Sequence, residues 1–151
     1  MGPTSKRQRQ EEAEDIERSG FEIYAPNPYH YYGPNQKFVD AVMEACETFY
    51  VPYNFERMYL IGSRARVEGR EDSDHDFVVV LADDTPNEII RDNGSCGHLG
   101  VATIRKSVKE LNPAGSSPDF VFCRFTDFMN RKDLPDEGFP YKAEHEGLRL
   151  K

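Results

Sequence analysis

One apolar run ends in the stretch Leu60-Ile61-Gly62-Ser63-Arg64-Ala65-Arg66. Ten residues separate Ser63 from the start of the next stretch, Asp74-His75-Asp76-Phe77-Val78-Val79-Val80-Leu81, which opens a second apolar run. The second run, residues 77–81, is continuously apolar and rich in valine, which is typical of a central strand covered on both faces. Residues 58–61 predict a shorter strand before it. Because the segment between the two strands is too short for a long crossover helix, we expect them to pair antiparallel.

Asp74 and Asp76 are separated by one residue where the second strand begins. Side chains alternate between the faces of a strand, so both carboxylates project to one side and His75 projects to the other. Neighbouring carboxylates repel each other unless a cation lies between them, and Mg²⁺ favours carboxylate and phosphate oxygens. The turn at Gly62 and Ser63 can offer backbone N–H groups and a hydroxyl to phosphate. The pattern predicts a nucleoside-triphosphate site, and a solvated turn before a strand is the simpler alternative.

Asp119 is the third acidic residue of interest, because it opens a predicted strand over residues 119–125. If that strand lies beside residues 77–81, three carboxylates converge at one end of the sheet and can hold two Mg²⁺ ions. Asp119 can then also act as a general base toward an attacking hydroxyl. The alternative is an ordinary turn aspartate at the start of a strand.

Three arginines, Arg64, Arg66 and Arg70, lie in the segment between the first two strands. The guanidinium fork matches the geometry of phosphate oxygens, so at least one of these arginines is predicted to bind a triphosphate. The alternative is a surface turn in which they pair with the neighbouring acidic residues. Farther along the chain, Arg105 and the lysines after it are predicted to lie on the solvent face of a helix, with an acidic patch on a partner as the other possibility.

Helical periodicity marks several further segments. An apolar stripe predicts a helix that begins after Asn35 and ends before Pro52, and a turn of helix is predicted over residues 63–68. Thr85 and Pro86 are the expected N-cap and first position of another helix. Other predicted elements are helices over 101–111 and 141–146 and a short extended segment over 148–150.

The order of these elements predicts an α/β (α+β) domain in which helices pack on a small mixed β-sheet. Residues 1–20 are polar and charge-rich, so a disordered tail is expected there. Residues 21–35 are rich in tyrosine and proline, which favours an extended arm that lies across the domain or forms a contact surface. The domain itself is expected to comprise residues 36–151.

Charge and composition exclude some classes of function. The chain has 151 residues and a formal net charge of −8, with an isoelectric point of about 5.0. General nucleic-acid binding requires a basic face and is therefore not expected. Cys46, Cys96 and Cys123 lack zinc-site spacing, so we expect reduced thiols in a cytoplasmic protein. No long apolar run predicts a membrane span or a signal peptide, and we expect a soluble protein.

The motif Gly62-Ser63-Arg64-Ala65-Arg66 followed by Asp74-His75-Asp76 resembles the minimal nucleotidyltransferases of the DNA polymerase β superfamily. Their signature is Gly-Ser, ten residues and Asp-x-Asp after an apolar strand, and the third acid of the family maps onto Asp119. The closing residues 143–150 also resemble the end of that family, so the similarity spans about residues 36–150. Val67 departs from the pattern, because glycine is common at that position.

The resemblance implies a polymerase-β-like nucleotidyltransferase core. It implies Mg²⁺-dependent transfer of a nucleoside monophosphate, AMP from ATP, to a hydroxyl of a protein partner, as in antitoxins that pair with a HEPN-type toxin. An acceptor that is a small hydroxylated molecule such as an aminoglycoside, and a non-catalytic nucleotide- or partner-binding module, remain alternatives. The implied site residues are Asp74, Asp76 and Asp119 as catalytic residues and metal ligands, and Gly62, Ser63, Arg64 and Arg66 as nucleotide-binding residues.

Overall fold

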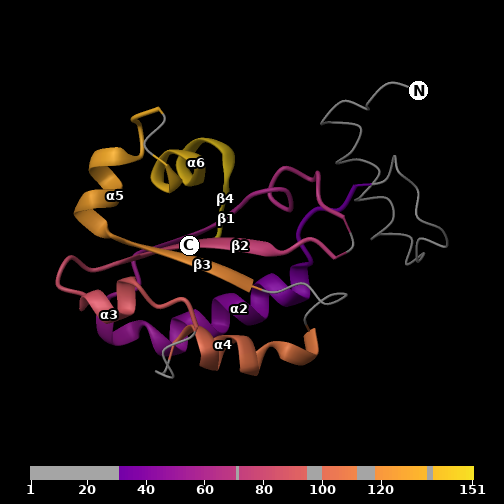
Figure 1. The fold of residues 1–151 in the computed structure, drawn as a ribbon, viewed down its shortest axis with the longest axis horizontal. Coiled ribbons are helices and arrows are strands. Elements are labelled where there is room, and N and C mark those ends of the chain that lie inside the picture. The colour runs from indigo at the N-terminus through magenta and orange to yellow at the C-terminus, as the bar shows by residue number, and fades with distance from the viewer. Residues whose placement is uncertain (1–30, 71, 95–99, 112–117, 136–137) are drawn as a thin grey trace.

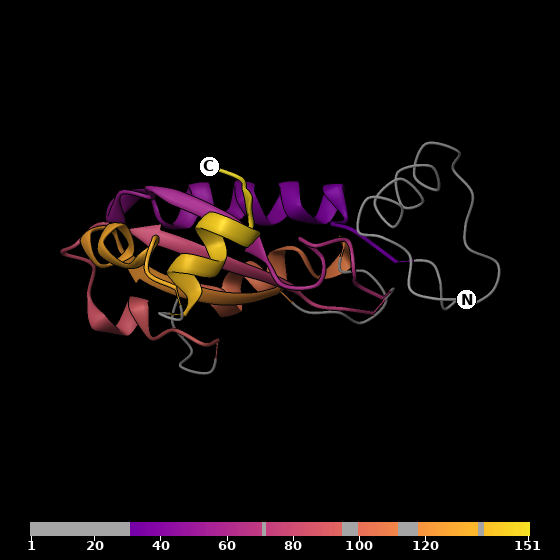
Figure 2. The same ribbon diagram turned by 90° about the horizontal axis from the view of Figure 1, so that it is seen from above.

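The computed structural model describes residues 31–70, 72–94, 100–111, 118–135 and 138–151. The predicted tail (1–20), most of the predicted arm (21–35) and Cys96 lie outside the described residues. The described chain forms a four-stranded mixed sheet with helices packed on both faces (Figures 1 and 2). This arrangement confirms the predicted α/β class.

The strands lie in the order β3-β2-β1-β4. Their bounds are β1 (Arg57–Ile61), β2 (His75–Leu81), β3 (Pro118–Arg124) and β4 (Leu148–Arg149). The helices of the described residues are α2 (Gln36–Phe49), η1 (Val51–Tyr53), α3 (Asn87–Ile90), α4 (Val101–Ser107), η2 (Lys109–Leu111), α5 (Phe125–Arg131) and α6 (Phe139–Glu146). Among these helices, none combines the length and the hydrophobicity needed to cross a bilayer.

Strand pairing places the acidic residues at one end of the sheet. The strands β1 and β2 pair antiparallel, as the short connection predicts, with Ile61 opposite Asp76. The strands β2 and β3 pair parallel, with Asp76 opposite Asp119. Residues that pair directly in neighbouring strands project to the same face, so the two carboxylates share one face of the sheet.

Two hydrophobic cores cover the two faces of β2, as its continuous apolar sequence predicts. The first core packs α2 and α4 against one face and includes Phe38, Phe77 and Ile104. The second packs α5 and α6 against the other face and includes Phe128 and Ala143. In Figure 1, α5 and α6 lie above the sheet and the other α-helices lie below it. Burial on both faces fixes the register of β2, because a shift by one residue would exchange its two faces.

The long helix α2 begins where the sequence predicts. The side chain of Asn35 accepts a hydrogen bond from the backbone N–H of Phe38 (3.1 Å), which satisfies one of the free donors of the first turn. The backbone N–H of Asn35 donates to Nε2 of His75 (3.0 Å). This second bond links the start of α2 to the first residue of β2.

Three helix predictions require correction. The helical turn predicted over residues 63–68 is not formed, and residues 63–67 make consecutive turns instead. The helix expected after Thr85 is a single turn, α3, and the Thr85 hydroxyl donates to the carbonyl of Ala82 (2.7 Å) instead of acting as its N-cap. The sequence patterns also missed α5, whose first turn is held from a distance: Asp83 accepts hydrogen bonds from the backbone N–H and the hydroxyl of Thr126.

His75 is buried on the core side of β2, and its ring lies against Phe38. Burial lowers the pKa of His75 to about 4, with the nearby Arg64 charge acting in the same direction. The ring is therefore neutral at pH 7, with Nε2 as acceptor and the proton on Nδ1. The position confirms that His75 faces away from the two neighbouring carboxylates.

We expect the protein to lose stability as the pH falls from about 6.5 to about 4, because unfolding lets His75 take up a proton that the folded state resists. A shift of this size corresponds to a loss of up to about 3 kcal/mol. Urea unfolding across this range, compared with His75→Gln, measures it, because the glutamine amide can accept the same bond without titrating. The two proteins compared, with and without His75→Gln, should both carry Asp76→Asn, because Asp76 titrates in the same pH range. Equal pH dependence with and without His75 would contradict the assignment.

Candidate active site

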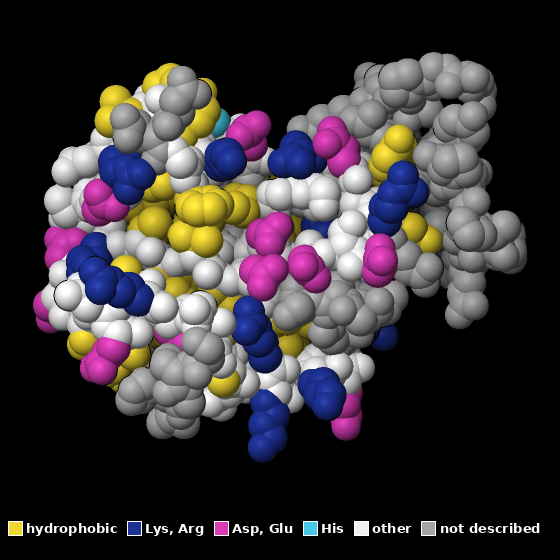
Figure 3. Space-filling view, viewed as in Figure 1, with side chains coloured by type: hydrophobic (Ala, Val, Ile, Leu, Met, Phe, Trp, Pro, Cys, Tyr) yellow, Lys and Arg dark blue, Asp and Glu magenta, His cyan; other side chains and the backbone are white. Residues whose placement is uncertain are grey.

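Two of the three predicted acidic residues meet at the end of the sheet that β2 and β3 share. Asp76 and Asp119 are paired in register, and both line one cavity with a volume of about 420 Å³. Asp74 lies just before β2 and is exposed, and its charge acts on Asp76. Acidic side chains gather near the centre of the face in Figure 3, with hydrophobic side chains next to them.

Charged and apolar side chains both line the cavity. Its size falls within the range of small-molecule sites, about 300–1,000 Å³. The charged lining residues are Arg66, Asp76, Asp119, Lys142 and Glu146. The apolar lining residues are Ile61, Val121 and Phe139. A ligand that carries both a charged end and an apolar end is therefore complementary to it.

The surroundings of Asp76 disfavour the negative charge of its carboxylate. Burial, together with the charges of Asp119 and Asp74, raises the pKa of Asp76 from 3.8 to about 6. A cation beside these carboxylates would relieve both the burial cost and the repulsion. The oxygen-only set of donors fits a hard ion such as Mg²⁺.

The described segments hold no group of three or more His, Cys, Asp or Glu side chains arranged as a metal site. Mg²⁺ is commonly held by one or two carboxylates together with water and the phosphates of a substrate. Asp76 and Asp119 supply that number of carboxylates inside the cavity. The residues thus fit an ion that arrives with a phosphorylated ligand.

Gly62 forms the turn that closes the end of β1. Its φ of +81° lies in the left-handed region, and a Cβ built there would lie 2.7 Å from Oδ2 of Asp76. Only glycine therefore lets this turn approach the carboxylate. Val67, five residues on, has a φ of 55°, which is unusual for a β-branched residue and explains why glycine would suit this position.

The predicted nucleotide-binding residues occupy different places. Gly62 and Arg66 line the cavity, and Arg66 Nε lies 3.1 Å from Oε2 of Glu68. Ser63 is partly buried in the same turn, and its carbonyl accepts from the backbone N–H of Glu68 (2.8 Å). Arg70 is exposed.

Arg64 is not among the residues that line the cavity. It is 3% exposed, and its guanidinium donates to the carbonyls of Ser73 (3.1 Å) and Gly33 (3.1 Å). These bonds tie the segment before β2 to the segment before α2. The structure therefore gives Arg64 a role in shaping the loop, and nothing here places its side chain near a phosphate.

Arg105 is a site residue that the sequence did not reveal. Its Nη2 lies 3.1 Å from Oδ1 of Asp119, and its Nε donates to the carbonyl of Pro118 (3.0 Å). Lys106 and Lys109 are exposed, as predicted for a solvated helix face, but Arg105 is only partly exposed and is held in this ion pair. Helical periodicity places Arg105 on the polar face of α4, but only the position of β3 shows that this face meets Asp119.

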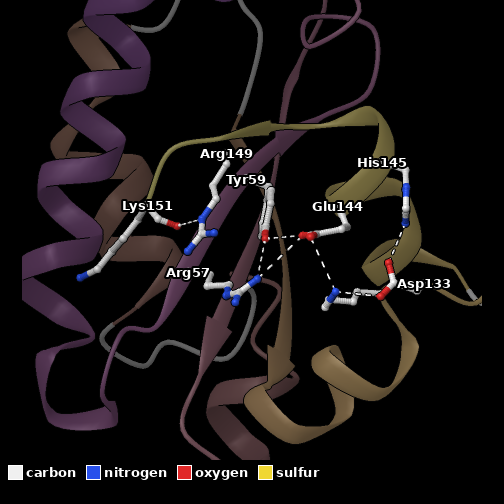
Figure 4. Close-up of polar contacts among 8 residues, drawn as sticks. Arg57, Tyr59, Asp133, Glu144, His145, Arg149 and Lys151 are labelled. Carbon is white, nitrogen blue, oxygen red and sulfur yellow. Dashed lines mark hydrogen bonds and ion pairs between the residues drawn. The ribbon is translucent and has the colours of Figure 1, made fainter.

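Helix α6 forms one wall of the cavity and supplies three further residues that sequence reasoning missed, Phe139, Lys142 and Glu146. Figure 4 shows how α6 is attached to the sheet. The Tyr59 hydroxyl of β1 donates to Oε2 of Glu144 (2.8 Å). A spacing of three and four residues along α6 groups these side chains on one face, but the predicted helix over 141–146 omitted Phe139, and no local pattern indicates what that face meets.

Replacing Tyr59 with phenylalanine is expected to lower the free energy of unfolding by about 1 kcal/mol, because the Glu144 carboxylate loses a buried donor. Urea unfolding measures the loss. Tyr53→Phe, at a partly buried tyrosine of η1, is the control and should change stability less. Equal effects at the two positions would show that the bond to Glu144 does not anchor α6.

Comparison of the chain with protein-family models found no matching family. Comparison with curated protein sequences also found no match.

Proposed function

We propose that the protein is a Mg²⁺-dependent nucleotidyltransferase that moves a nucleoside monophosphate, AMP from ATP, to a hydroxyl group. The observation that carries the proposal is the pairing of Asp76 with Asp119 across β2 and β3 inside a cavity that also borders the Gly62 turn. Nucleotidyl transfer requires paired carboxylates that hold the metal ion and, beside them, a turn that can bind phosphate.

Asp76 and Asp119, with Asp74 beside them, are the residues that would hold Mg²⁺. When bound, the ion supplies positive charge that offsets the negative charge of the phosphates. The backbone at Gly62, the Ser63 hydroxyl and the Arg66 guanidinium are the groups that bind and orient the triphosphate. Gly62 and Arg66 line the cavity together with Asp76 and Asp119, and Ser63 follows Gly62 in the same turn, which supports positioning of the triphosphate beside the carboxylates.

In the proposed reaction the acceptor hydroxyl oxygen forms a bond to the α-phosphorus. The bond between that phosphorus and the oxygen bridging to the β-phosphate breaks, and pyrophosphate leaves with the bonding electron pair. Asp119 accepts the proton of the attacking hydroxyl. For Asp119 to do so, its carboxylate must part from the Arg105 guanidinium or share an oxygen with it.

A protein hydroxyl is the acceptor that we propose, and a HEPN-type toxin is the partner that the resemblance suggests. Support comes from the α6 wall, where Lys142 and Glu146 line the cavity and are exposed. A hydroxyl on a large partner can approach along this exposed wall. We also propose, from the same resemblance, that the protein acts in the cytoplasm.

The test uses ATP labelled at either the α- or the γ-phosphate, Mg²⁺ and a co-expressed HEPN-type partner that carries Arg-x4-His-x-Tyr. We expect label from the α-phosphate alone to reach the partner, and chelation of Mg²⁺ to stop transfer. Aminoglycosides in parallel reactions test the small-molecule acceptor. Transfer of the γ-label, or no transfer to any acceptor, would contradict the proposal.

One observation favours a second candidate, a nucleotide- or partner-binding module without catalysis. The ion pair between Arg105 and Asp119 already neutralises the proposed base. Under this alternative the cavity binds a nucleotide, and neither Mg²⁺ nor an acceptor leads to turnover. Arg105→Gln separates the two candidates, because it should leave a binding module inactive, whereas in an enzyme it should change the rate of transfer.

A further inference from the structure

We infer that Phe139 provides the surface on which the nucleobase stacks, so that one nucleotide spans the cavity from the Gly62 turn to α6. This inference rests on the proposed function and adds a base subsite to it. The cavity is lined by the charged residues Arg66 and Asp76 and also by the apolar side chains of Ile61, Val121 and Phe139. A nucleoside triphosphate likewise combines an anionic chain with a planar apolar ring.

Phe139 is a large aromatic side chain that is nevertheless exposed to solvent. It is 43% exposed, whereas Phe128 of neighbouring α5 is fully buried in the core. Exposed aromatic side chains that line a pocket are typical of ligand-binding surfaces. The ring of Phe139 is therefore available for a flat partner in a way that the core aromatics are not.

The position of Phe139 is fixed by the attachment of α6. Pro140 and Ala143 are buried against the sheet, and Glu144 accepts a hydrogen bond from Tyr59. Lys142 Nζ lies 5.7 Å from the centroid of the Phe139 ring. The Lys142 ammonium therefore covers one face of the Phe139 ring, and the proposed base stacks on the other face, with the cation close to its phosphates.

Stacking predicts little discrimination between bases, because every base presents a π face. ATP and GTP are expected to bind with similar affinity, and pyrimidine nucleotides somewhat more weakly because their rings cover less area. Specificity in the proposed site then lies in the triphosphate and the acceptor. This expectation follows from the apolar character of the subsite.

The test compares binding of ATP and of inorganic tripolyphosphate, both with Mg²⁺, by titration calorimetry. Tripolyphosphate offers the phosphates without a base. We expect Phe139→Ala to weaken ATP binding by about 5- to 100-fold, the range that a lost stacking contact produces, and to leave tripolyphosphate binding unchanged. Phe139→Tyr keeps the ring and should bind ATP as the unaltered protein does.

Leu111→Ala is the matched control, because Leu111 is a similarly exposed apolar residue on η2 and is not among the cavity residues. Phe139→Leu serves where the alanine variant fails to fold. Equal losses for ATP and tripolyphosphate would overturn the base subsite, as would unchanged ATP binding with impaired transfer to an acceptor. Failure of the unaltered protein to bind either ligand would instead reject the proposed function.

Discussion

Replacing Asp76 with asparagine is expected to reduce nucleotidyl transfer by about a thousandfold or more, while the protein remains folded. The substitution keeps the shape of the side chain and removes the negative charge that lies in register with Asp119. Loss of a single preorganised charged group at a reacting centre costs about 10²–10³ in rate, and the loss of a metal ligand adds to this. The measurement is transfer of α-labelled ATP under saturating Mg²⁺.

The same substitution is expected to stabilise the protein at pH 7 when no metal is present. The pKa of Asp76 is raised to about 6 in the folded state, so its contribution to stability is present below pH 3.8 and is lost as the pH rises through 6. The neutral amide avoids that loss. After allowance for solvent screening in an open cavity, the gain is about 1 kcal/mol.

Thermal unfolding with and without Mg²⁺ and ATP completes the test. We expect ligand to raise the melting temperature of the unaltered protein and to have little effect on the Asp76→Asn variant. Asp84→Asn is the matched control, because Asp84 is an exposed carboxylate beyond the opposite end of β2. Full activity of Asp76→Asn, or the same loss in Asp84→Asn, would refute the assigned role.

Replacing Gly62 with alanine is expected to abolish nucleotide binding and to lower the free energy of unfolding by about 1–3 kcal/mol. Two effects add. The φ of +81° is unfavourable for a residue with a Cβ, and the new methyl group would lie 2.7 Å from Oδ2 of Asp76. Either the turn or the carboxylate has to move. Urea unfolding and titration with Mg²⁺ and ATP measure the two losses.

Gly138→Ala separates the two effects. Gly138 has a φ of +89°, but the nearest atom to a Cβ there is Nη2 of Arg131 at 3.7 Å, an ordinary contact. The variant should show backbone strain without a clash, about 1–3 kcal/mol, because a φ of 89° with a ψ of −141° is unfavourable for a residue with a Cβ. In addition, Gly62→Ala should cost less when combined with Asp76→Ala, because the clashing oxygen is gone. An equal cost in both backgrounds would show that the carboxylate does not restrict the turn.

The strands and the first long helix were predictable because their signals are local. The apolar run of residues 77–81 identifies a strand buried on both faces, and Asn35 identifies the start of α2. That the strand of Asp119 lies beside β2 was only a condition for the site, and the sequence left the direction of the pairing open. The structure satisfies that condition by placing Asp119 opposite Asp76.

The features that sequence reasoning missed depend on contacts between distant segments. Asp83, just after β2, supports the first turn of α5 just after the neighbouring strand β3, so no local capping pattern marks that helix. Arg105 is an ordinary polar-face residue until β3 brings Asp119 against it. Arg64 belongs to a motif that suggests phosphate, but the carbonyls that hold it come from two separate loops. Local patterns do not contain this information.

The in-register placement of Asp76 and Asp119 also has a consequence for how the protein folds. The antiparallel partners β1 and β2 are close in sequence, whereas β3 is about 40 residues beyond β2, and closing a longer loop costs more entropy. This pairing brings two like charges together at one end of the sheet. Divalent ions in the surrounding medium should therefore favour it during folding, because they offset the repulsion between the two carboxylates.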